Sequence, residues 1–350
     1  MKNYRRFCAV LIGAVFFIAA IFKLIDPVGA ELVVTDYLSF LHLYFLWPLS
    51  KPIAVGMALL EALVGAALLT GLWRKAAAIA SGVLTVVFTA LTVAIWISPQ
   101  VMECGCFGEV IHLSEQQTVI KNGVLCALWL IAFLPFRDFG EPRKPKYAAF
   151  SLTMLSVGFL TVYSLLRLPI VDYTPFKPGI EIQQSLLTDL EKAPLLSFSD
   201  AEGDYPYELA CGPHVMVVSV YAPDRFDEAD WVRTDAFIQR LEEGGFFPLL
   251  LLSGNESTVR DAGTPEWILP RAYYSDQREL MTLNRSNGGA TYIAEGQIIC
   301  KRAASALPEA ERLSSFRRSD PTGLMIEESS RGRVRLQAFL LYAFAVMLLI

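Results

Sequence analysis

Long apolar runs separated by short polar connections dominate the first half of the chain. Each run approaches the ~20 residues that an α-helix needs to cross a bilayer. The pattern predicts five membrane-spanning helices, at residues 7–25, 52–73, 76–97, 118–136 and 148–166. A shorter apolar run at 336–350 predicts a sixth spanning helix.

Two features near the N-terminus refine this pattern. Residues 37–49 are apolar and aromatic but contain His42 and Pro48, which predicts a helix lying on the membrane surface. Arg5 and Arg6 precede the first run, as basic residues precede a secretory signal. Because no small-residue cleavage site follows this run, it is interpreted as a retained anchor helix.

The pattern after Pro169 is that of a folded α/β domain. Glu295-Gly296 separates the last two apolar runs, which predicts a hairpin. The order of the elements predicts an α/β sandwich around a central mixed sheet. The expected strands are 195–198, 215–221, 247–252, 291–293 and 297–300, and the expected helices are 229–243 and 277–283.

The composition agrees with a membrane protein. Hydrophobic residues make up 54% of the chain and charged residues only 19%, whereas soluble domains are about a quarter charged. Contact with membrane lipid is therefore expected. The formal net charge of −5 gives no basic footprint, so we expect no nucleic-acid partner.

Basic residues predict the orientation of the helices, because they concentrate in cytoplasmic connections. They cluster at the N-terminus, at Arg74-Lys75 and in residues 137–146, whereas the intervening connections carry acidic residues instead. We therefore expect a multi-pass membrane protein with a cytoplasmic N-terminus. This orientation places residues 169–332 outside the cytoplasm.

The most informative motif is Cys104-Gly105-Cys106, which is expected to face that oxidising compartment. The two cysteines can form a disulfide because Gly105 lacks a Cβ and allows a tight turn. Such a small ring would be strained, and strained disulfides are more labile and more oxidising. The alternatives are a static disulfide that closes the loop, two packed thiols, or a metal site, for which the spacing is poor. The residues that could complete a metal site are Glu103, Glu109 and His112.

Ionisable residues in or beside the apolar runs form a supporting polar cluster: Lys23, Asp26, Glu61 and Lys121. Charges at membrane depth are costly and usually face the bundle interior or one another. Lys23 and Lys121 are expected on the same side as the cysteines, where ammonium groups would favour the reactive thiolate. The alternative is structural, with snorkelling lysines and an ion pair at Glu61 that fixes helix packing.

The other four cysteines are expected to be structural. Cys8 and Cys126 lie within helices, and Cys211 and Cys300 are not expected to form a disulfide with each other. The chain therefore offers no second thiol pair to relay electrons. A partner protein or a quinone would have to accept the electrons from a redox-active pair.

Four stretches within residues 5–136 resemble one family: residues 22–27, 61–74, 103–108 and Lys121-Asn122. They resemble the DoxX-like membrane proteins, in particular the branch of the methylamine-utilisation protein MauE. The resemblance implies a four-helix membrane bundle. It also implies a role in maturing a disulfide-rich client together with a thioredoxin-like partner.

The second half of the chain resembles a thioredoxin-like domain in residues 198–203 and 220–223. Fused DoxX-like proteins of the Bacteroides group have a similar layout. The resemblance is incomplete, because residues 224–228 contain no cysteine and Gly288-Gly289 occupies the expected place of the cis-proline. This domain is therefore expected to bind or position a partner without dithiol chemistry.

The expected fold class is thus an all-α DoxX-like four-helix membrane bundle with extra transmembrane helices and an α/β thioredoxin-like domain outside the cytoplasm. The expected parts are the four-helix domain at 1–140, a fifth helix at 141–168, a linker at 169–190, the thioredoxin-like domain at 191–313, a tether at 314–335 and a sixth helix at 336–350.

Three functions are compatible with these observations. The first is thiol–disulfide oxidoreductase activity through Cys104 and Cys106, acting on a periplasmic client or redox partner. The second is a non-catalytic assembly scaffold, with the thioredoxin-like domain as a docking module. The third is a carrier of a quinone or another small molecule.

Overall fold

The computed structural model of the chain describes residues 2–98, 105–108, 113–134, 145–182 and 196–328, with five single residues beyond them at 330, 334, 337, 338 and 341. The chain forms two compact units. One comprises Met1–Leu165 with Gln337–Ile350, and the other comprises Leu166–Leu336.

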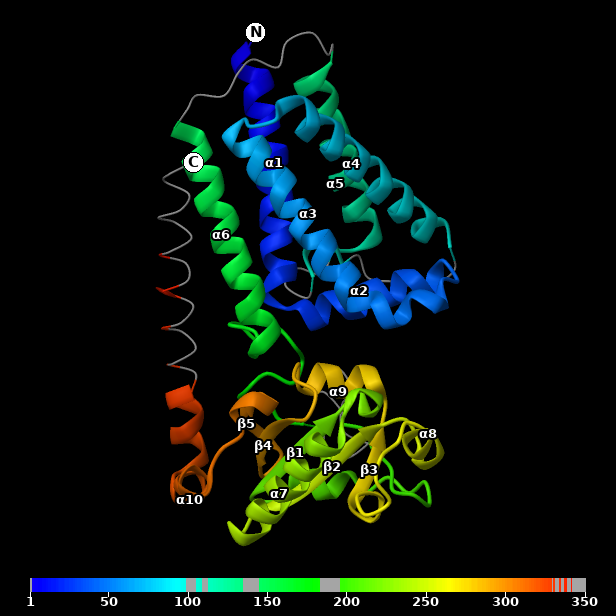
Figure 1. The fold of residues 1–350 in the computed structure, drawn as a ribbon, viewed down its shortest axis with the longest axis vertical. Helices are drawn as coiled ribbons and strands as arrows, with labels where there is room; N and C mark the ends of the chain where they lie inside the picture. The colour runs from blue at the N-terminus through cyan, green and yellow to red at the C-terminus, as the bar shows by residue number, and fades with distance from the viewer. Residues whose placement is uncertain are drawn as a thin grey trace. The chain divides into compact units, whose positions relative to one another are not determined.

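The first unit is helical (Figure 1). Its described helices are α1 Lys2–Ile25, α2 Pro27–Phe40, α3 Ser50–Thr70, α4 Arg74–Ile97, α5 Glu115–Phe133 and α6 Pro145–Leu166. α3 ends where Gly71 adopts a left-handed conformation with φ of 77°, as glycine does after many helices. α5 begins with a capping box between Ser114 and Gln117, which satisfies backbone N–H groups of its first turn.

Four helical segments are long and apolar enough to cross a membrane: Tyr4–Ile25, Tyr44–Thr70, Arg74–Ile97 and Lys146–Leu166. They correspond to four of the five spans predicted by hydropathy. The remaining span, predicted at 118–136, forms helix α5, which packs against α1 and α4. This helix is not among those long and apolar enough to cross a membrane. Most of the sixth predicted helix, 336–350, lies outside the described residues.

The connection after α1 differs from the prediction. The expected surface helix at 37–49 is wrong, because α2 ends at Phe40 and Tyr44–Leu49 forms a separate 3-10 helix, η1. α2 begins much earlier, since the Asp26 carboxylate accepts a hydrogen bond from Gly29 N at 2.9 Å and Pro27 occupies the first turn. Such a cap and a proline at this position both favour the start of a helix.

The second unit contains a five-stranded mixed sheet in the order β3-β2-β1-β4-β5 (Figure 1). β1 is parallel to β2 and β2 is parallel to β3, whereas β4 is antiparallel to both β1 and β5. The strands are β1 Val215–Val220, β2 Phe247–Ser253, β3 Ala272–Ser275, β4 Gly289–Ala294 and β5 Gln297–Arg302. The helices are α7 Glu228–Glu243, α8 Glu256–Asp261, α9 Gln277–Leu283 and α10 Ala310–Arg318.

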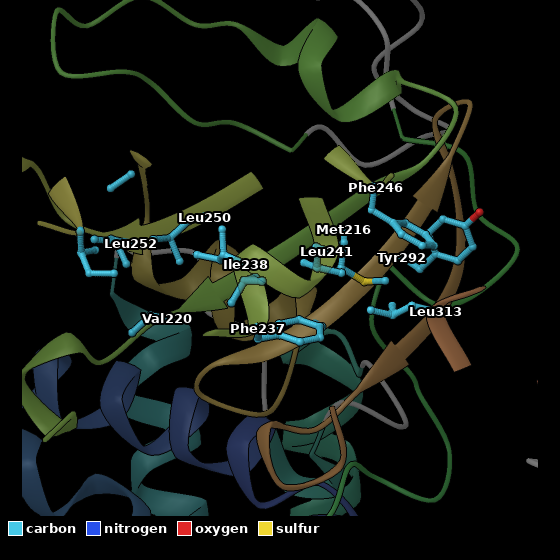
Figure 2. Packing of buried hydrophobic residues seen from close by; sticks show 14 of the residues in the cluster. Met216, Val220, Phe237, Ile238, Leu241, Phe246, Leu250, Leu252, Tyr292 and Leu313 are labelled. Atoms are coloured by element: carbon cyan, nitrogen blue, oxygen red, sulfur yellow. The ribbon is translucent and has the colours of Figure 1, made fainter. Parts of the chain in front are cut away.

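The core of this unit lies between α7 and the sheet (Figure 2). Phe237, Ile238 and Leu241 of α7 are at most 2% exposed and belong to one cluster with Met216 of β1 and Tyr292 of β4. All six residues of β1 are buried, as expected for the central strand of a sheet covered on both faces. The predicted mixed α/β sheet is therefore confirmed at the level of fold class.

Chain segments cover both edges of the sheet. Gly179 N donates to Ile298 O at 2.7 Å and Ile182 N donates to Gly296 O at 2.8 Å, which adds part of the predicted linker to the edge of β5. The predicted strand at 195–198 is wrong for its described residues 196–198, which form no strand; the next residue, Ser199, forms a single bridge with Tyr274 of β3.

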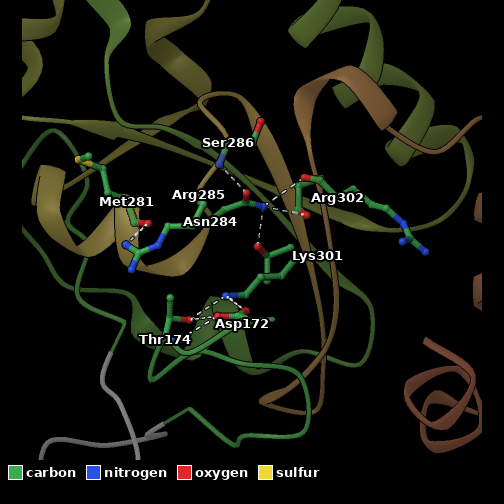
Figure 3. A network of polar contacts seen from close by, with 10 residues as sticks. Asp172, Thr174, Met281, Asn284, Arg285, Ser286, Lys301 and Arg302 are labelled. Atoms are coloured by element: carbon green, nitrogen blue, oxygen red, sulfur yellow. Dashed lines mark hydrogen bonds and ion pairs between the residues drawn. The ribbon is translucent and has the colours of Figure 1, made fainter. Parts of the chain in front are cut away.

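A polar contact fixes the start of this unit against β5 (Figure 3). Lys301 Nζ lies 2.7 Å from Asp172 Oδ2 and donates to Thr174 Oγ1 at 3.1 Å. Burial opposes ionisation of Asp172, but the Lys301 ammonium and the bonds from Thr174 hold the pKa of this carboxyl below its usual value. Residues 172–182 are thus part of the folded unit.

The predicted tether at 314–335 is wrong for its described first half. Residues 314–318 complete α10, and residues 321–328 are also helical. Phe316 and Leu324 are 3% and 7% exposed and join the core of the sheet. These apolar side chains explain why an otherwise polar segment folds.

One carboxyl of this unit should make its stability depend on pH. Burial raises the pKa of Glu279 to about 7, in spite of a hydrogen bond from Ser197 N, and the nearby charge of Asp276 adds to the rise. An unfolded glutamate titrates near ~4.3, so the unfolded chain releases its proton first and stability falls as the pH rises from about 4.3 to above 7.

We therefore expect Glu279→Gln to stabilise this unit at pH 8 by up to about 3 kcal/mol, with little effect at pH 4. Unfolding of the full chain in detergent, followed by its tryptophan fluorescence, to which buried Trp231 of this unit contributes, measures this difference. The exposed Glu243→Gln is the control. An equal effect of Glu279→Gln at both pH values would contradict the prediction.

Candidate functional site

The loop Gly105–Phe107, a 3-10 turn labelled η2, packs against α1 and α2. The Phe107 ring contacts the Phe22 ring edge-to-face, with centroids 6.4 Å apart. A Cβ added at Gly105 would lie 2.0 Å from Val33 Cγ1 and 2.8 Å from Val33 Cβ, so rotating the valine would not make room. The glycine between the two cysteines is therefore required by the close approach of this loop to α2.

Four residues of the predicted site lie outside the described residues. They are Cys104 and the three residues that could complete a metal site, Glu103, Glu109 and His112. Within the described part of the chain, no group of three or more His, Cys, Asp or Glu side chains could hold a metal ion.

Lys23 and Glu61 form a buried ion pair between α1 and α3. Lys23 Nζ lies 2.6 Å from Glu61 Oε1 and 2.9 Å from Oε2, so it contacts both carboxylate oxygens. The side chains are 13% and 1% exposed, respectively. Lys23 Nζ also lies 5.5 Å from the centroid of the Phe88 ring. This pair links the two helices and agrees with the structural interpretation of these charges.

Lys121 and Asn122 lie side by side in the sequence of α5 but have different contacts. Asn122 Nδ2 donates to Thr92 Oγ1 at 3.0 Å, which fixes α5 against α4. The Lys121 ammonium lies 5.2 Å from the centroid of the Phe107 ring. Among the described residues, no carboxylate forms a salt bridge with Lys121, so its contact with the η2 loop is a cation–π contact.

These side chains line one cavity of about 210 Å³ inside the membrane unit. The rest of its wall is mainly aliphatic and aromatic. Its charged and amide members and its thiol come from α1, α3, α5 and η2: Lys23, Glu61, Lys121, Asn122 and Cys106. Tyr37 of α2 and Thr85 and Thr92 of α4 add hydroxyl groups. The fold thus brings one of the two predicted cysteines together with three members of the predicted polar cluster.

Asp26, the fourth member of the polar cluster, has another role. It is 4% exposed and caps α2 through Gly29 N, and it is not part of the cavity wall. Its contribution to the site is therefore indirect, since it fixes the start of the helix on which the η2 loop rests.

The α/β unit shows no dithiol at the end of β1. The chain there forms the turn Pro223–Arg225 and then α7, with Asp227 as its cap. Asn287 ties the opposite loop to this point, because its side-chain amide exchanges two hydrogen bonds of 3.0 and 3.1 Å with the backbone of Ala222. A Cβ added at Gly288 would lie 2.8 Å from the Phe226 ring, which packs closely beneath that loop.

The two cysteines of the α/β unit are poor nucleophiles. They are not bonded to each other, which confirms the prediction. Burial raises the pKa of the Cys300 thiol to about 11, and burial together with Glu208 raises the pKa of Cys211. Because the thiolate is the reactive form, neither favours exchange near neutral pH.

Several residues of the cavity had no signal in the sequence. Thr92 and Phe88 of α4 and Val33 of α2 read as ordinary apolar or small residues of a helix. Only contact between helices distant in sequence makes them part of a site. Asn122 did carry a signal, because an amide within an apolar run needs a hydrogen-bond partner.

The helices and the polar cavity define a multi-pass membrane protein. Residues 1–135 match the family model described as methylamine utilisation protein MauE, so this part of the chain is MauE-like. The match covers α1 to α5, the η2 loop and every residue of the cavity wall. Searches of curated proteins and of solved structures returned no match.

Proposed function

We propose that the chain is a membrane-bound accessory factor that exchanges disulfides with a client protein of the cell envelope through Cys104 and Cys106. The observation that supports it best is the presence of Cys106 in the wall of a cavity that also holds Lys121, whose ammonium lies over the Phe107 ring of the same loop. Ammonium groups near a thiol stabilise the thiolate, which is the nucleophile in exchange. An accessory role also agrees with the similarity to MauE.

The exchange balances as follows. A client thiolate attacks the Cys104–Cys106 disulfide, which breaks that bond and forms a mixed disulfide with one of the two cysteines. A second client thiolate then attacks the client sulfur and releases the cysteine. The client gains a disulfide, and Cys104 and Cys106 gain the two electrons and two protons that the client dithiol loses, and so become a dithiol.

The proposal includes an orientation in the bacterial inner membrane. The N-terminus lies in the cytoplasm, and the η2 loop and residues 169–332 lie in the periplasm, as the distribution of basic residues favours. The α/β unit is proposed to be a thioredoxin-like docking module for the client or for a redox partner. In support of docking, β1 is followed by a proline turn instead of a dithiol, and the two thiols of this unit have raised pKa values.

Purified full-length protein in detergent tests this function. After oxidation, the protein should convert a reduced dithiol peptide into its disulfide. Each chain should oxidise one peptide, and its own Cys104–Cys106 disulfide should become a dithiol. Cys106→Ser should abolish this conversion and instead accumulate a mixed disulfide between Cys104 and the peptide when the mixture is oxidised. Cys126→Ser, which changes a helix cysteine that contacts Thr89, is the matched control and should behave as the parent.

The scaffold interpretation makes the opposite prediction. If the disulfide is only a static closure of the loop, the oxidised chain will leave the peptide reduced. Cys106→Ser will then differ from the parent in stability alone. A peptide oxidised equally well by the Cys106→Ser variant would also refute the assigned role of the pair.

A further inference from the structure

The cavity beside Cys106 is suited to a flat, apolar ligand. Its volume is about 210 Å³, and side chains of α1 to α5 together with the η2 loop form its wall. Phe16, Phe88 and Phe107 contribute aromatic rings, and Val33, Leu38 and Met57 contribute aliphatic groups. Because the unit spans the membrane, the molecules that reach such a wall most readily are those dissolved in lipid.

One side of the wall also carries a hydrogen-bond donor that is not committed to a carboxylate. Glu61 already neutralises Lys23 at 2.6 Å, and Asn122 Nδ2 already donates to Thr92. By contrast, no salt bridge to Lys121 is present within the described residues: its ammonium lies over the Phe107 ring, and its charge acts on Glu61 only beyond direct contact. The Lys121 ammonium can therefore donate to an oxygen of a ligand in the cavity without breaking a salt bridge.

The cavity extends to the surface of the unit at the end of α2. Leu41, which directly follows this helix, lines the cavity and is 44% exposed. Tyr37 and Leu38, one turn earlier, line it as well. A ligand with a flexible hydrocarbon tail could thus place its ring inside and its tail along α2.

We propose that this cavity binds the ring of a lipid-soluble quinone, which oxidises the cysteine pair. The inference rests on the proposed function and supplies the electron acceptor that it lacks. Lys121 Nζ donates a hydrogen bond to one quinone carbonyl. The site is thus both a binding pocket and the place where the dithiol returns to the disulfide.

The reaction balances without a further reactant. Cys104 and Cys106 lose two electrons and two protons, and one sulfur–sulfur bond forms. The quinone gains the two electrons and two protons, one proton on each carbonyl oxygen, and leaves as the hydroquinone. A fatty acyl chain could fill the same apolar wall, but it would accept no electrons and would not need the Lys121 donor.

Anaerobic mixing of reduced full-length protein with ubiquinone-1 in detergent tests the inference. The quinone absorbance should fall as hydroquinone forms, and one quinone should be reduced for every two thiols that are oxidised. Met57→Trp, which fills the cavity from α3, should slow this reduction at least tenfold, and Lys121→Met should raise the quinone concentration needed for half the maximal rate at least fivefold. Val86→Trp on α4 is the matched control, because this residue is 64% exposed and not part of the cavity wall.

Binding is measured separately from chemistry. Cys106→Ser should reduce no quinone, yet ubiquinone-1 should still raise its unfolding temperature, because a ligand that binds the folded state stabilises it. This rise should be lost in the Cys106→Ser chain that also carries Met57→Trp. The proposal would be overturned in favour of an acyl chain by two results together: a fatty acid of matched length raises the unfolding temperature as much as ubiquinone-1 does, and the parent reduces no quinone.

The two proposals fail in different ways. If the parent oxidises the dithiol peptide but never reduces ubiquinone-1, the quinone site is wrong and the exchange function stands. If the Met57→Trp variant reduces ubiquinone-1 as fast as the parent does, the cavity is not the quinone site. If ubiquinone-1 oxidises the pair but the peptide stays reduced, the client exchange is wrong instead.

Discussion

Replacing Lys23 by methionine should destabilise the membrane unit by about 5 kcal/mol, and replacing Glu61 by leucine should cost about 3 kcal/mol, at the two ends of the range for breaking a buried ion pair. The difference follows from exposure. Without Lys23, a carboxylate with a 1% exposed side chain loses its contacting counter-ion and keeps only the more distant charge of Lys121, whereas without Glu61 the 13% exposed lysine can extend toward water.

The variant with both substitutions should recover most of this loss. A buried ion pair replaced on both sides by apolar groups is often neutral or stabilising, because no charge remains to be desolvated. Unfolding of the full chain with increasing sodium dodecyl sulfate in mixed micelles measures the four free energies of the cycle. A double variant that loses the sum of the two single effects would show that the pair contributes no coupling between α1 and α3.

The same cycle separates structure from chemistry at the site. Lys23 and Glu61 both line the cavity, so a folded double variant can be assayed for quinone reduction. If the double variant still reduces quinone, the Lys23–Glu61 pair acts only in helix packing. Lys121 would then be the residue whose charge contributes to quinone binding, as measured with Lys121→Met.

Hydropathy predicted the membrane helices well because each span must be apolar along its whole length. It missed the start of α2, which carries Asp26 and Glu31 and therefore resembles a polar connection. Both residues are at most 5% exposed. A charged residue that caps a helix or lies buried between helices cannot be told from a solvated one by composition.

The α/β unit shows a similar division. The strands β1, β2, β4 and β5 were predictable from runs of apolar residues bounded by turns. β3 has only four residues, Ala272–Ser275, and is held in place by its pairing with β2. Its neighbour Ser199 gains its bridge from this pairing as well, so neither could be assigned before the sheet order was known.

The cavity was the least predictable feature. Lys23 and Glu61 are 38 positions apart, and their contact depends on how α1 and α3 cross. The sequence supplied residue types suited to a site, namely two lysines, a carboxylate and a thiol. Only the packing decided that Lys121 faces the η2 loop while Asp26 caps a helix.

That packing depends on glycines at the crossing of α1 and α3. A Cβ added at Gly65 would lie 2.7 Å from Phe17 N and 2.9 Å from Gly13 O, which are backbone atoms that cannot rotate away. Small residues of this kind allow membrane helices to approach closely. Gly56 on the same helix has no atom within 4 Å of its added Cβ and provides a matched control.

Gly65→Ala should therefore destabilise the membrane unit by about 3 kcal/mol, the upper part of the range for overpacking. Gly56→Ala should instead stabilise α3 by up to about 1 kcal/mol, because alanine is the better helix former. Titration with sodium dodecyl sulfate measures both. Since a forced separation also pulls Lys23 from Glu61, Gly65→Ala should cost less in the Lys23→Met/Glu61→Leu background than in the parent. Equal behaviour of the two glycine variants would mean that α1 and α3 do not meet at Gly65.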